Sequence, residues 1–378
     1  MTNIHDILVT GGAGYIGSHL VDALVARDYR VTVLDNLEPQ VHRSGTWPSY
    51  ANPRATYVQG DVRDRARLEP LVLAADAVVH FAAAVSVGQS MYQVDRYVDV
   101  NTRGTALLLD ILVNAKHHVQ KVVVASSIGV YGEGAYRCAT HGVVAPGIRA
   151  EAPLAARDWE QRCPSCGEHV TSIPTPEDKP LYRDNIYSMT KYHQEEMVLL
   201  IGKTYGIPSV APRFFNVYGP RQSLSNPYAG VAAIWLSRLL NGRQPVVFED
   251  GGQLRDFVSI HDVVRCLVLM IEQSGADFLP VNVGSGETVT ILDIARLLTR
   301  LLGSDIEPQI TQTGRRFDIR HNTADISRAR TTLGYAPSVS LEQGFTELIE
   351  WAKTTPDVAE DFFDRALTEL SEKGLLVR

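Results

Sequence analysis

The sequence predicts an α/β protein with a doubly wound parallel sheet, followed by a smaller C-terminal lobe. Short apolar runs alternate with helical patterns through the first half of the chain, as a parallel sheet with helices on both faces requires. A glycine-rich turn follows the first apolar run, at residues 11–17. A stretch rich in Pro, Gly, Cys and His interrupts the alternation at residues 134–180. We therefore expect one sheet domain that carries an insert.

The expected strands of the sheet are short apolar runs bounded by turn or helix signals. They lie at residues 7–10, 30–34, 56–59, 77–81, 121–125 and 208–213. Helical patterns stand between them, for example at residues 16–27 and 105–114, and residues 187–205 continue as a helix after the insert. Pro212 cannot donate to a ladder, so the sixth strand is expected to end early or to lie at an edge. Three breakers, Pro39, Gly45 and Pro48, predict a loop over residues 36–53.

Beyond Gly219 the pattern becomes irregular, which indicates a smaller lobe. Its expected helices lie at residues 231–240, 263–272 and 291–302, and its expected strands at residues 246–248, 256–259 and 281–283. The predicted organisation is a sheet domain over residues 1–215, with the insert at 134–180, then mainly the smaller lobe over residues 216–355. A charged, helix-prone tail follows over residues 356–378.

The composition is that of an ordinary globular protein, with 45% apolar and 21% charged residues in a chain of 378. The formal net charge of −7 disfavours binding to nucleic acid or to an anionic membrane surface. No apolar run approaches the length of a membrane span, and the chain enters its first expected strand almost at once. We therefore expect a cytoplasmic protein, without a disulfide framework because it has only four cysteines.

The glycine-rich turn predicts a Rossmann-type dinucleotide site. Its glycines recur at a spacing of three residues as Gly11, Gly14 and Gly17, and with Gly12 in first place they fit the looser pattern G-x-G-x-x-G. Such a turn lets backbone N–H groups approach a pyrophosphate, and the helix that begins around Tyr15 and Ile16 directs its positive end at the same group. Asp35 ends the second apolar run, where an acid accepts hydrogen bonds from an adenosine ribose and disfavours a 2′-phosphate. The expected cofactor is therefore NAD.

Tyr187 and Lys191 are the expected catalytic pair, because residues four apart share one face of a helix. A lysine ammonium one turn away, together with a nicotinamide cation, favours the phenolate of a tyrosine that is otherwise a poor base. Ser127 ends the fifth expected strand, from where its hydroxyl can bond the same substrate oxygen. Tyr-x-x-x-Lys alone is also compatible with an ordinary surface pair, but the cofactor turn favours catalysis.

A set of motifs identifies the chain as resembling extended short-chain dehydrogenases/reductases of the nucleotide-sugar epimerase/dehydratase family. They are TGGAGYIG at 10–17, LDNL at 34–37, GDVRD at 60–64, HFAA at 80–83, NTRGT at 101–105, SSIGVYG at 126–132, YSMTK at 187–191, RFFNVYGPRQ at 213–222 and RDFVSIHDV at 255–263. The resemblance covers nearly the whole chain except the insert and the tail.

The resemblance implies roles for further residues around NAD and the substrate. The residues implied to hold or line the cofactor, beyond those of the turn, are Asp35, Asn36, Asp61, Val62, Phe81, Ala82, Ala83, Asn101, Ser126, Tyr187 and Lys191. Asn216 is implied to lie near the sugar diphosphate, which Arg255 and Arg315 are implied to clamp with their forked donors. Arg316 is an alternative to Arg315. A homodimer, formed through a helix pair that includes residues 187–205, is implied as well.

Residues 128 and 129 select among the reactions of this family. Family dehydratases resemble Thr-Asp-Glu-Val-Tyr-Gly in this motif, whereas Ile128 and Gly129 occupy the two acidic positions here. Dehydration is therefore disfavoured. Decarboxylation is disfavoured as well, because family decarboxylases usually keep a glutamate at the position of Gly129. What remains is 4-epimerisation: Tyr187 takes the O4 proton, NAD takes a hydride from C4, and the 4-keto sugar rotates before the hydride returns.

The insert contains a pattern typical of a zinc site. Cys138-x2-His141 is followed by Cys163-x2-Cys166, and two such pairs can place four ligands on one tetrahedral ion. Four protein ligands indicate a structural metal, which suits a polar insert with little apolar matter. Free thiols in a loop, or a ligand set with His169 in place of His141, remain open.

The insert and two neighbouring stretches, NPYAGVAAIW at 226–235 and FEDGGQLRDFV at 248–258, resemble the bacterial dTDP-L-rhamnose 4-epimerase branch. The expected substrate is therefore a nucleoside-diphosphate sugar, dTDP-L-rhamnose or dTDP-6-deoxy-L-talose. A UDP-hexose or UDP-hexuronate 4-epimerase and a 4-keto-sugar reductase of the same fold are the alternatives. A redox-sensing protein on this scaffold is disfavoured because Tyr187 and Lys191 are both present.

Overall fold

A parallel sheet of eight strands forms the centre of the protein in the computed structural model, which describes residues 4–226, 228, 230–316, 318–355 and 361–377. The strand order is β3-β2-β1-β4-β5-β10-β15, and β6 continues beside β10 where β5 has ended. The bounds are β1 Asp6–Thr10, β2 Arg30–Asp35, β3 Thr56–Gln59, β4 Ala77–His80, β5 Lys121–Val124, β6 Ser126–Ser127, β10 Ser209–Phe214 and β15 Leu279–Val283. The order reverses between β1 and β4, which is where folds of this kind bind ligands.

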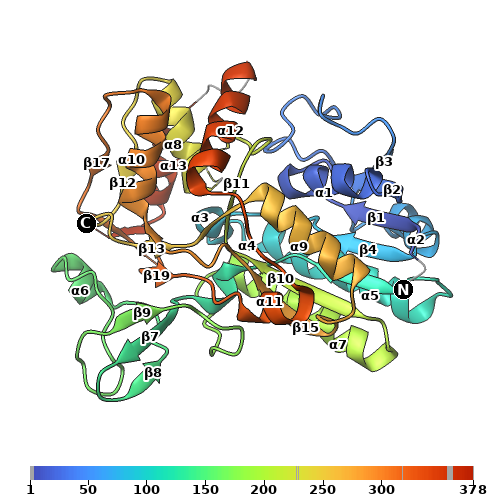
Figure 1. The fold of residues 1–378 in the computed structure, drawn as a ribbon, viewed down its shortest axis with the longest axis horizontal. Coiled ribbons are helices and arrows are strands. Elements are labelled where there is room, and N and C mark those ends of the chain that lie inside the picture. Colours follow the sequence, from blue (N-terminus) through green and yellow to red (C-terminus); the bar gives the residue numbers. More distant parts are fainter. Residues whose placement is uncertain (1–3, 227, 229, 317, 356–360, 378) are drawn as a thin grey trace.

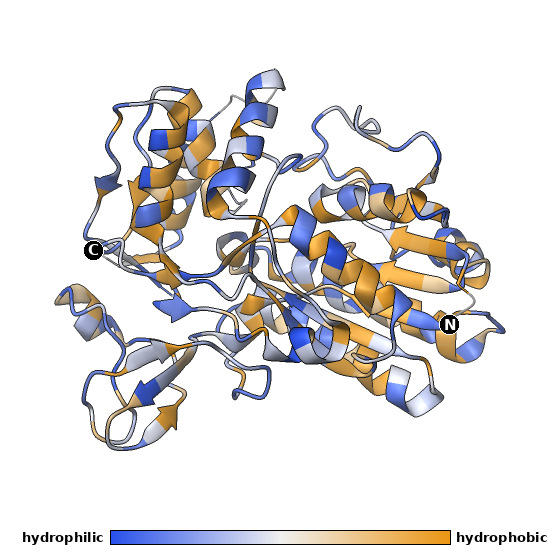
Figure 2. Cartoon of the chain, viewed as in Figure 1, coloured by the Kyte–Doolittle hydropathy of each residue, from blue (hydrophilic) through white to orange (hydrophobic). Residues whose placement is uncertain are grey.

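Helices cover both faces of this sheet, which confirms the predicted doubly wound architecture (Figure 1). One face carries α1 (Tyr15–Val25), α9 (Ile260–Glu272) and α11 (Ser327–Leu333), and the other carries α2 (Arg65–Leu73), α5 (Gly104–Asn114) and α7 (Ile186–Tyr205). Alternate residues of a strand point to opposite faces, so Val9 packs with the first set and Leu8 with the second. The strands are accordingly hydrophobic along most of their length (Figure 2).

Short segments on the second face connect β4 to α5. They are α3 (Val87–Ser90), α4 (Val94–Tyr97) and the π-helical η1 (Val98–Arg103), which runs directly into α5. The long stretch between β2 and β3 has no helix or strand, as expected for the predicted loop.

Two sequence predictions about the sheet are wrong. Pro212 neither ends β10 nor lies at an edge, because β10 runs on to Phe214 with neighbours on both sides. The proline is tolerated because pairing on the β5/β6 side stops at Val210 and resumes at Arg213. Residues 281–283, expected in the smaller lobe, form part of β15 in the main sheet. The chain leaves the sheet after β10 and returns to it, which local patterns do not reveal.

The smaller lobe has its own core, built from α8 (Val231–Leu240), α10 (Ile291–Leu302) and α12 (Leu341–Thr354). Trp235, Leu298 and Phe345 are fully buried there, and the rings of Tyr218 and Phe345 stack with centroids 4.1 Å apart. Its short strands are β11 Asn216–Tyr218, β12 Val246–Val247, β13 Leu254–Arg255, β14 Phe257–Ser259, β16 Val289–Thr290, β17 Gln309–Ile310, β18 Gly314–Arg315 and β19 His321–Asn322.

The tail contains the helix α13 (Phe363–Glu372) and the strand β20 (Leu376–Val377), which pairs antiparallel with β18. Residues 356–360 and 378 of the predicted tail, and residues 227 and 229 of the stretch 226–235, lie outside the described part of the chain. Within the described residues, no helix has both the length and the apolar character needed to cross a membrane.

The insert is a small antiparallel sheet that stands apart from the central sheet (Figure 1). Its strands are β7 (Ala135–Cys138), β8 (Gly142–Val144) and β9 (Thr171–Ile173), with β7 in the middle, and one short helix, α6 (Glu151–Ala155), follows β8. Beside the candidate metal ligands, Tyr136 and Val170 pack with Cys138 and Cys163 in a small buried cluster, and Leu154 and Trp159 are buried elsewhere in the insert.

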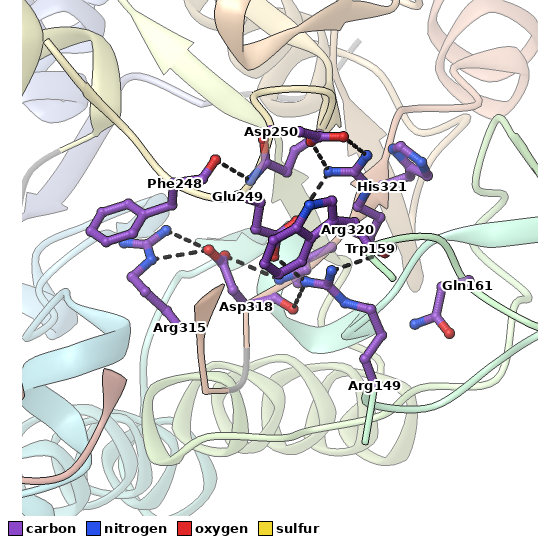
Figure 3. A network of polar contacts seen from close by, with 12 residues as sticks. Arg149, Trp159, Gln161, Phe248, Glu249, Asp250, Arg315, Asp318, Arg320 and His321 are labelled. Carbon is purple, nitrogen blue, oxygen red and sulfur yellow. Dashed lines mark hydrogen bonds and ion pairs between the residues drawn. The ribbon is translucent and has the colours of Figure 1, made fainter. Parts of the chain in front are cut away.

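Ion pairs attach the insert to the smaller lobe, and the pair of Arg149 and Glu249 is buried (Figure 3). Arg149 Nη2 lies 2.6 Å from Glu249 Oε1, and Arg320 Nη2 lies 2.6 Å from Glu160 Oε1. Glu249 is fully buried and also accepts from Arg320 Nη1 at 3.0 Å, so one carboxylate joins the two arginines.

Candidate active site and metal centre

A cavity of about 780 Å³ opens at the carboxyl ends of β1, β4, β6 and β10, between the sheet domain and the smaller lobe. Most of the site residues expected from the sequence line it together. They are Gly11, Gly14, Tyr15, Ile16, Gly17, Asp35, Asn36, Asp61, Val62, Phe81, Ala82, Ala83, Ser126, Ser127, Tyr187, Lys191 and Asn216. Three expected residues, Asn101, Arg255 and Arg315, are not part of the lining.

The glycine turn leaves no room for a side chain at Gly11 or at Gly17. A Cβ on Gly11 would lie 2.7 Å from the backbone nitrogen of Ala82, and one on Gly17 would lie 2.4 Å from the Gly11 carbonyl oxygen. Gly11 also has a φ of 71°, which is costly for other residues. Helix α1 begins without a side-chain cap, so its first N–H groups remain available to an anion.

The acids at the far end of the cavity are arranged to accept hydrogen bonds. Asp35 receives the N–H groups of Ala13 at 3.0 Å and of Leu37 at 2.9 Å, which orients its carboxylate. Hydrogen bonds from Arg63 lower the pKa of Asp61 to about 2, and Asn36 Nδ2 donates to the same carboxylate at 3.1 Å. These side chains fit a ribose and an adenine amine, so the residues present suit the adenosine half of NAD.

Tyr187, Lys191 and Ser127 meet at the other end of the cavity. Helix α7 is capped by Asn185, whose side chain accepts the Ser188 N–H at 2.8 Å, and this places Tyr187 in the first turn. Burial raises the pKa of the Tyr187 hydroxyl, and a hydrogen bond with Ser127 opposes that shift. Burial also lowers the pKa of Lys191 to about 7. Its protonation near neutral pH therefore depends on the charges and hydrogen bonds around it.

Two expected residues support the site through hydrogen bonds, Asn101 from behind the cavity wall and Ser126 from within it. Asn101 is buried and bonds Ala84 through both its carbonyl, at 2.7 Å, and its amide, at 3.0 Å. Its amide also donates to Thr190 on α7 at 2.9 Å, so it fastens the cavity wall to the helix of Tyr187. Ser126 donates to Glu195 at 2.5 Å. We find these residues supporting the site, and direct contact of Asn101 with a cofactor stays a prediction.

The arginines expected to clamp a diphosphate have other partners in this structure. Arg255 donates to the carbonyls of Ile319 at 2.5 Å and Arg320 at 3.0 Å. Arg315 forms an ion pair with Asp318 at 2.7 Å and lies over the ring of Phe248. Both interactions hold the smaller lobe together, and a role of these arginines toward substrate stays a prediction.

Polar atoms that lack partners lie elsewhere in the lining. Among the described lining residues, four polar atoms are buried without a hydrogen bond: the Tyr15 hydroxyl, Asn216 Oδ1, Arg221 Nη1 and Gln222 Oε1. Buried polar atoms are costly unless bonded, so these four are suited to groups of a bound ligand. The sequence analysis named Tyr15 and Asn216 only. Arg221 and Gln222 end the motif at 213–222. The signal that could have identified them as site residues is that two polar residues follow the glycine and the proline of this motif.

The end of the cavity at Tyr187, Lys191 and Ser127 has no carboxylate among the described lining residues. The acids of the lining are Asp35, Glu38 and Asp61. Asp35 and Asp61 belong to the adenosine end, and Glu38 is paired with Arg96 at 3.0 Å. A Cβ on Gly129 would lie 2.7 Å from Ser188 Oγ, so a side chain at this position would require the Ser188 hydroxyl to move.

The four predicted metal ligands come together in the insert. Cys138 Sγ lies 3.6 Å from His141 Nδ1 and 3.7 Å from Cys166 Sγ, and Cys163 Sγ lies 3.6 Å from the same histidine nitrogen. All four ligand atoms are within 4.8 Å of one another. Zinc bonds of about 2.3 Å to sulfur and 2.0 Å to nitrogen at tetrahedral angles put neighbouring ligand atoms about 3.5–3.8 Å apart. Three of the distances between candidate ligand atoms therefore match those of a tetrahedral metal site.

Comparison with known proteins supports this interpretation of the cavity. The sequence profile of the family described as NAD dependent epimerase/dehydratase matches residues 7–146 and 164–284. The dTDP-L-rhamnose 4-epimerase of Burkholderia thailandensis is 36% identical over 349 residues, which cover 91% of this chain and 94% of the relative. The profile passes over residues 147–163, which lie inside the insert.

Two solved structures have the same architecture. The UDP-glucose 4-epimerase of Thermotoga maritima, in complex with UDP-glucose, superposes with a TM-score of 0.77 at 31% identity, covering 93% of this chain and 99% of that one. The UDP-glucuronic acid 4-epimerase of Bacillus cereus, with UDP-glucuronic acid and NAD, gives a TM-score of 0.75 at 27% identity, covering 92% and 99%.

Proposed function

The chain belongs to the NAD-dependent epimerase/dehydratase family, and from this premise we propose that it is a nucleotide-sugar 4-epimerase acting through a 4-keto intermediate. The observation that carries the proposal is the catalytic end of the cavity, where Tyr187, Lys191 and Ser127 meet and no described lining residue is an acid. A tyrosine, a serine and a lysine suffice for reversible oxidation of a carbinol, whereas loss of water needs a further acid.

The protein side chains divide the work of proton transfer. NAD, when bound, supplies a hydride acceptor and donor for C4. Tyr187 accepts the proton of the O4 hydroxyl and later returns it to the 4-keto oxygen, while Ser127 donates a hydrogen bond to that oxygen. Lys191 supports the phenolate by its charge. The tight turn at Gly11 and Gly17 holds the pyrophosphate, because only glycine fits this close approach.

The proposed substrate is dTDP-L-rhamnose or its C4 epimer, dTDP-6-deoxy-L-talose. The support is the Burkholderia thailandensis relative, which matches along nearly its whole length. UDP-hexoses and UDP-hexuronates are the alternative substrates, because structurally similar 4-epimerases bind UDP-glucose and UDP-glucuronic acid. A 4-keto-sugar reductase of the same fold would consume a reduced cofactor, whereas a 4-epimerase regenerates NAD.

Incubation with a panel of sugar nucleotides tests the proposal. The purified protein is mixed with dTDP-L-rhamnose, UDP-glucose and UDP-glucuronate, without added cofactor, and products are resolved by NMR at C4. We expect inversion at C4 of one member of the panel, fastest for dTDP-L-rhamnose. Turnover that requires a stoichiometric supply of reduced cofactor would instead identify a reductase.

We further propose that the insert holds a structural zinc ion on Cys138, His141, Cys163 and Cys166. Their spacing fits a tetrahedral ion, and N–H groups of Thr140 and His141 point at Cys138 Sγ, as is common around metal-bound thiolates. With four protein ligands the ion has no open position, so its contribution is to folding. Metal analysis of the purified protein tests this, with one equivalent of zinc expected.

A homodimer through α7 and the segments before α5 is the proposed assembly. Val94 and Val98 are 44% and 42% exposed, and Met189 and Leu200 on α7 are 40% and 64% exposed. An apolar surface of this kind on adjacent helices favours burial against a second copy. Light scattering at micromolar concentration is expected to give twice the mass of the chain.

A further inference from the structure

A continuous row of buried polar side chains runs beneath the cavity from the glycine turn to Lys191. Its members, none more than 3% exposed, are Thr10, His80, Thr105, Gln194 and Lys191. Neighbours in the row are joined by hydrogen bonds of 2.8 Å from Thr10 to His80, 3.0 Å from His80 to Thr105, 2.8 Å from Thr105 to Gln194 and 2.7 Å from Gln194 to Lys191. The row crosses β1, β4, α5 and α7, so it links four elements of the sheet domain.

The direction of the first hydrogen bonds follows from the chemistry of the lysine. An ammonium group has donors only, so Lys191 Nζ donates to Gln194 Oε1 and the amide nitrogen of Gln194 must face Thr105. Thr105 donates its own proton to the carbonyl of Asn101 at 2.7 Å. The Thr105 oxygen is therefore an acceptor toward Gln194.

The remaining bonds follow in the same way. Because the Thr105 proton is already used, His80 Nε2 carries a proton and donates it to Thr105, which leaves His80 Nδ1 to accept from Thr10. Thr10 Oγ1 accepts in turn from the Ala82 N–H at 3.3 Å. Burial lowers the pKa of His80 to about 3, so this histidine stays neutral and Lys191 is the member of the row that can carry a charge near neutral pH.

We propose that Gln194 is a positioning residue for Lys191: its amide oxygen holds the ammonium group on the Tyr187 face of α7 and anchors it, through Thr105 and His80, to the strand that carries the glycine turn. This inference rests on the proposed roles of Tyr187 and Lys191 in 4-epimerisation. A neutral acceptor is what the site requires, because it stabilises the ammonium without adding a negative charge. A carboxylate in its place would cancel the field that favours the Tyr187 phenolate.

Few other ionisable groups of the described chain bear on Lys191. Tyr187 stands on its own helix, with Tyr97 of α4 against the tyrosine ring at 6.5 Å between centroids, and His80 faces it from β4. Glu195 follows Gln194 on α7 but is buried against Arg213 at 2.5 Å. From α5 and β6 the facing side chains, Thr105 and Ser127, are neutral at working pH.

Two substitutions of Gln194 are expected to shift the pH profile of kcat in different ways. Gln194→Leu removes an acceptor from the charged lysine, so the alkaline limit of activity moves down by about one pH unit and kcat at pH 8 falls about tenfold. Gln194→Glu keeps the shape of the side chain but adds a charge, so the alkaline and the acid limits both move up. The assay uses the sugar nucleotide of the panel that the wild-type holoenzyme converts fastest, and its KM is expected to change less than twofold.

Controls separate this inference from the proposed function. Gln161→Leu removes another buried glutamine with one donated hydrogen bond, to the Gly147 carbonyl at 3.0 Å, and is expected to leave both limits unchanged. Lys191→Met is expected to abolish turnover, and wild-type activity of that variant would overturn the catalytic roles themselves. If Lys191→Met is inactive while both Gln194 variants lose rate equally at every pH, the inference about Gln194 is wrong. If Gln194→Leu fails to fold, the near-isosteric Gln194→Glu variant tests the inference by itself. The inference then requires that both the acid and the alkaline limit of its pH profile of kcat move up.

Discussion

The cofactor turn and the Cys/His insert reach a defined shape by different means. The turn lies on a sheet whose strands are buried on both faces, and its geometry follows from contacts such as that between Gly17 and the Gly11 carbonyl. The insert has a small apolar cluster of four buried residues, and it also contains four candidate ligand atoms and the ion pairs of Arg149 and Arg320. The comparison teaches that a large core can shape a binding site by itself, whereas the small polar insert relies on ion pairs and, as we propose, on a bound metal ion.

Removal of the Tyr187 hydroxyl is expected to have the largest effect on activity. This effect is expected to be confined to the cavity and to leave the insert unchanged. Tyr187→Phe should lower kcat by at least about 10³-fold, because the general base is lost, while NAD affinity and zinc content stay as in the wild type. Rate measurements with the best sugar nucleotide, together with NAD quantification, check this. Tyr192→Phe on the same helix is the control, and a comparable rate loss there would contradict a specific role for Tyr187.

Substitution of a candidate metal ligand is expected to destabilise the insert and to leave the stability of the sheet unchanged. Cys163→Ser is expected to lose the zinc ion and several kcal/mol of stability in the insert, because metal binding and folding are coupled. Hydrogen exchange of residues 135–173 should rise, with the exchange of α1 and β1 unchanged. Cys266→Ala, at a buried cysteine away from the cluster, should retain the metal. An insert that stays protected without metal would show that the ion has no structural part.

The junction between insert and lobe is expected to depend on Glu249. This fully buried carboxylate forms ion pairs with Arg149 at 2.6 Å and with Arg320 at 3.0 Å. The Glu249→Gln substitution therefore removes one negatively charged partner from each arginine. Breaking a buried pair of this kind costs about 3 kcal/mol, measurable by urea unfolding. Glu342→Gln removes the exposed partner of Arg300 and should cost less than about 1 kcal/mol. Equal losses in the two variants would contradict a special role for the buried network.

The smallest expected effect concerns the acid dependence of stability at the cofactor end. Hydrogen bonds from Arg63 lower the pKa of Asp61 to about 2 in the folded protein, below its value in the unfolded chain. Its stabilising contribution is therefore present above pH 4 and is lost as the pH falls toward 2. Because Asp61 is partly exposed, solvent screening reduces the contribution to about 1 kcal/mol. In Asp61→Asn, the decrease in the free energy of unfolding between pH 4 and pH 2 should be smaller by that amount. An unchanged pH dependence would contradict a stabilising role of the Asp61 carboxylate.

Local signals in the sequence were sufficient to predict that the glycine turn and the pair Tyr187 and Lys191 line one cavity, and the catalytic roles of the pair stay a prediction. The spacing of Gly11, Gly14 and Gly17, and that of Tyr187 and Lys191, lies within one turn or one helix, so the chemistry follows from neighbours along the chain. The same holds for the paired ligands of the insert, each pair being separated by two residues. These residues line the cavity or form the cluster as predicted.

Features that depend on tertiary packing were not predictable. Residues 281–283 have the apolar character of any strand, and only the path of the chain back to the sheet makes them part of β15. The direction of the Arg255 side chain depends on carbonyls about 65 residues away along the chain. Gln194 lies one turn after Lys191, yet its role depends on Thr105 and His80, which the fold brings from other elements.

Transfer of a deuterium label tests the central claim most directly. The preferred sugar nucleotide is prepared with deuterium at C4 and incubated in ordinary water with the enzyme and no added cofactor. If the hydride leaves C4 and returns to it within one active site, the product of inverted configuration keeps the deuterium at C4. Replacement of that deuterium by hydrogen from the solvent would contradict the account.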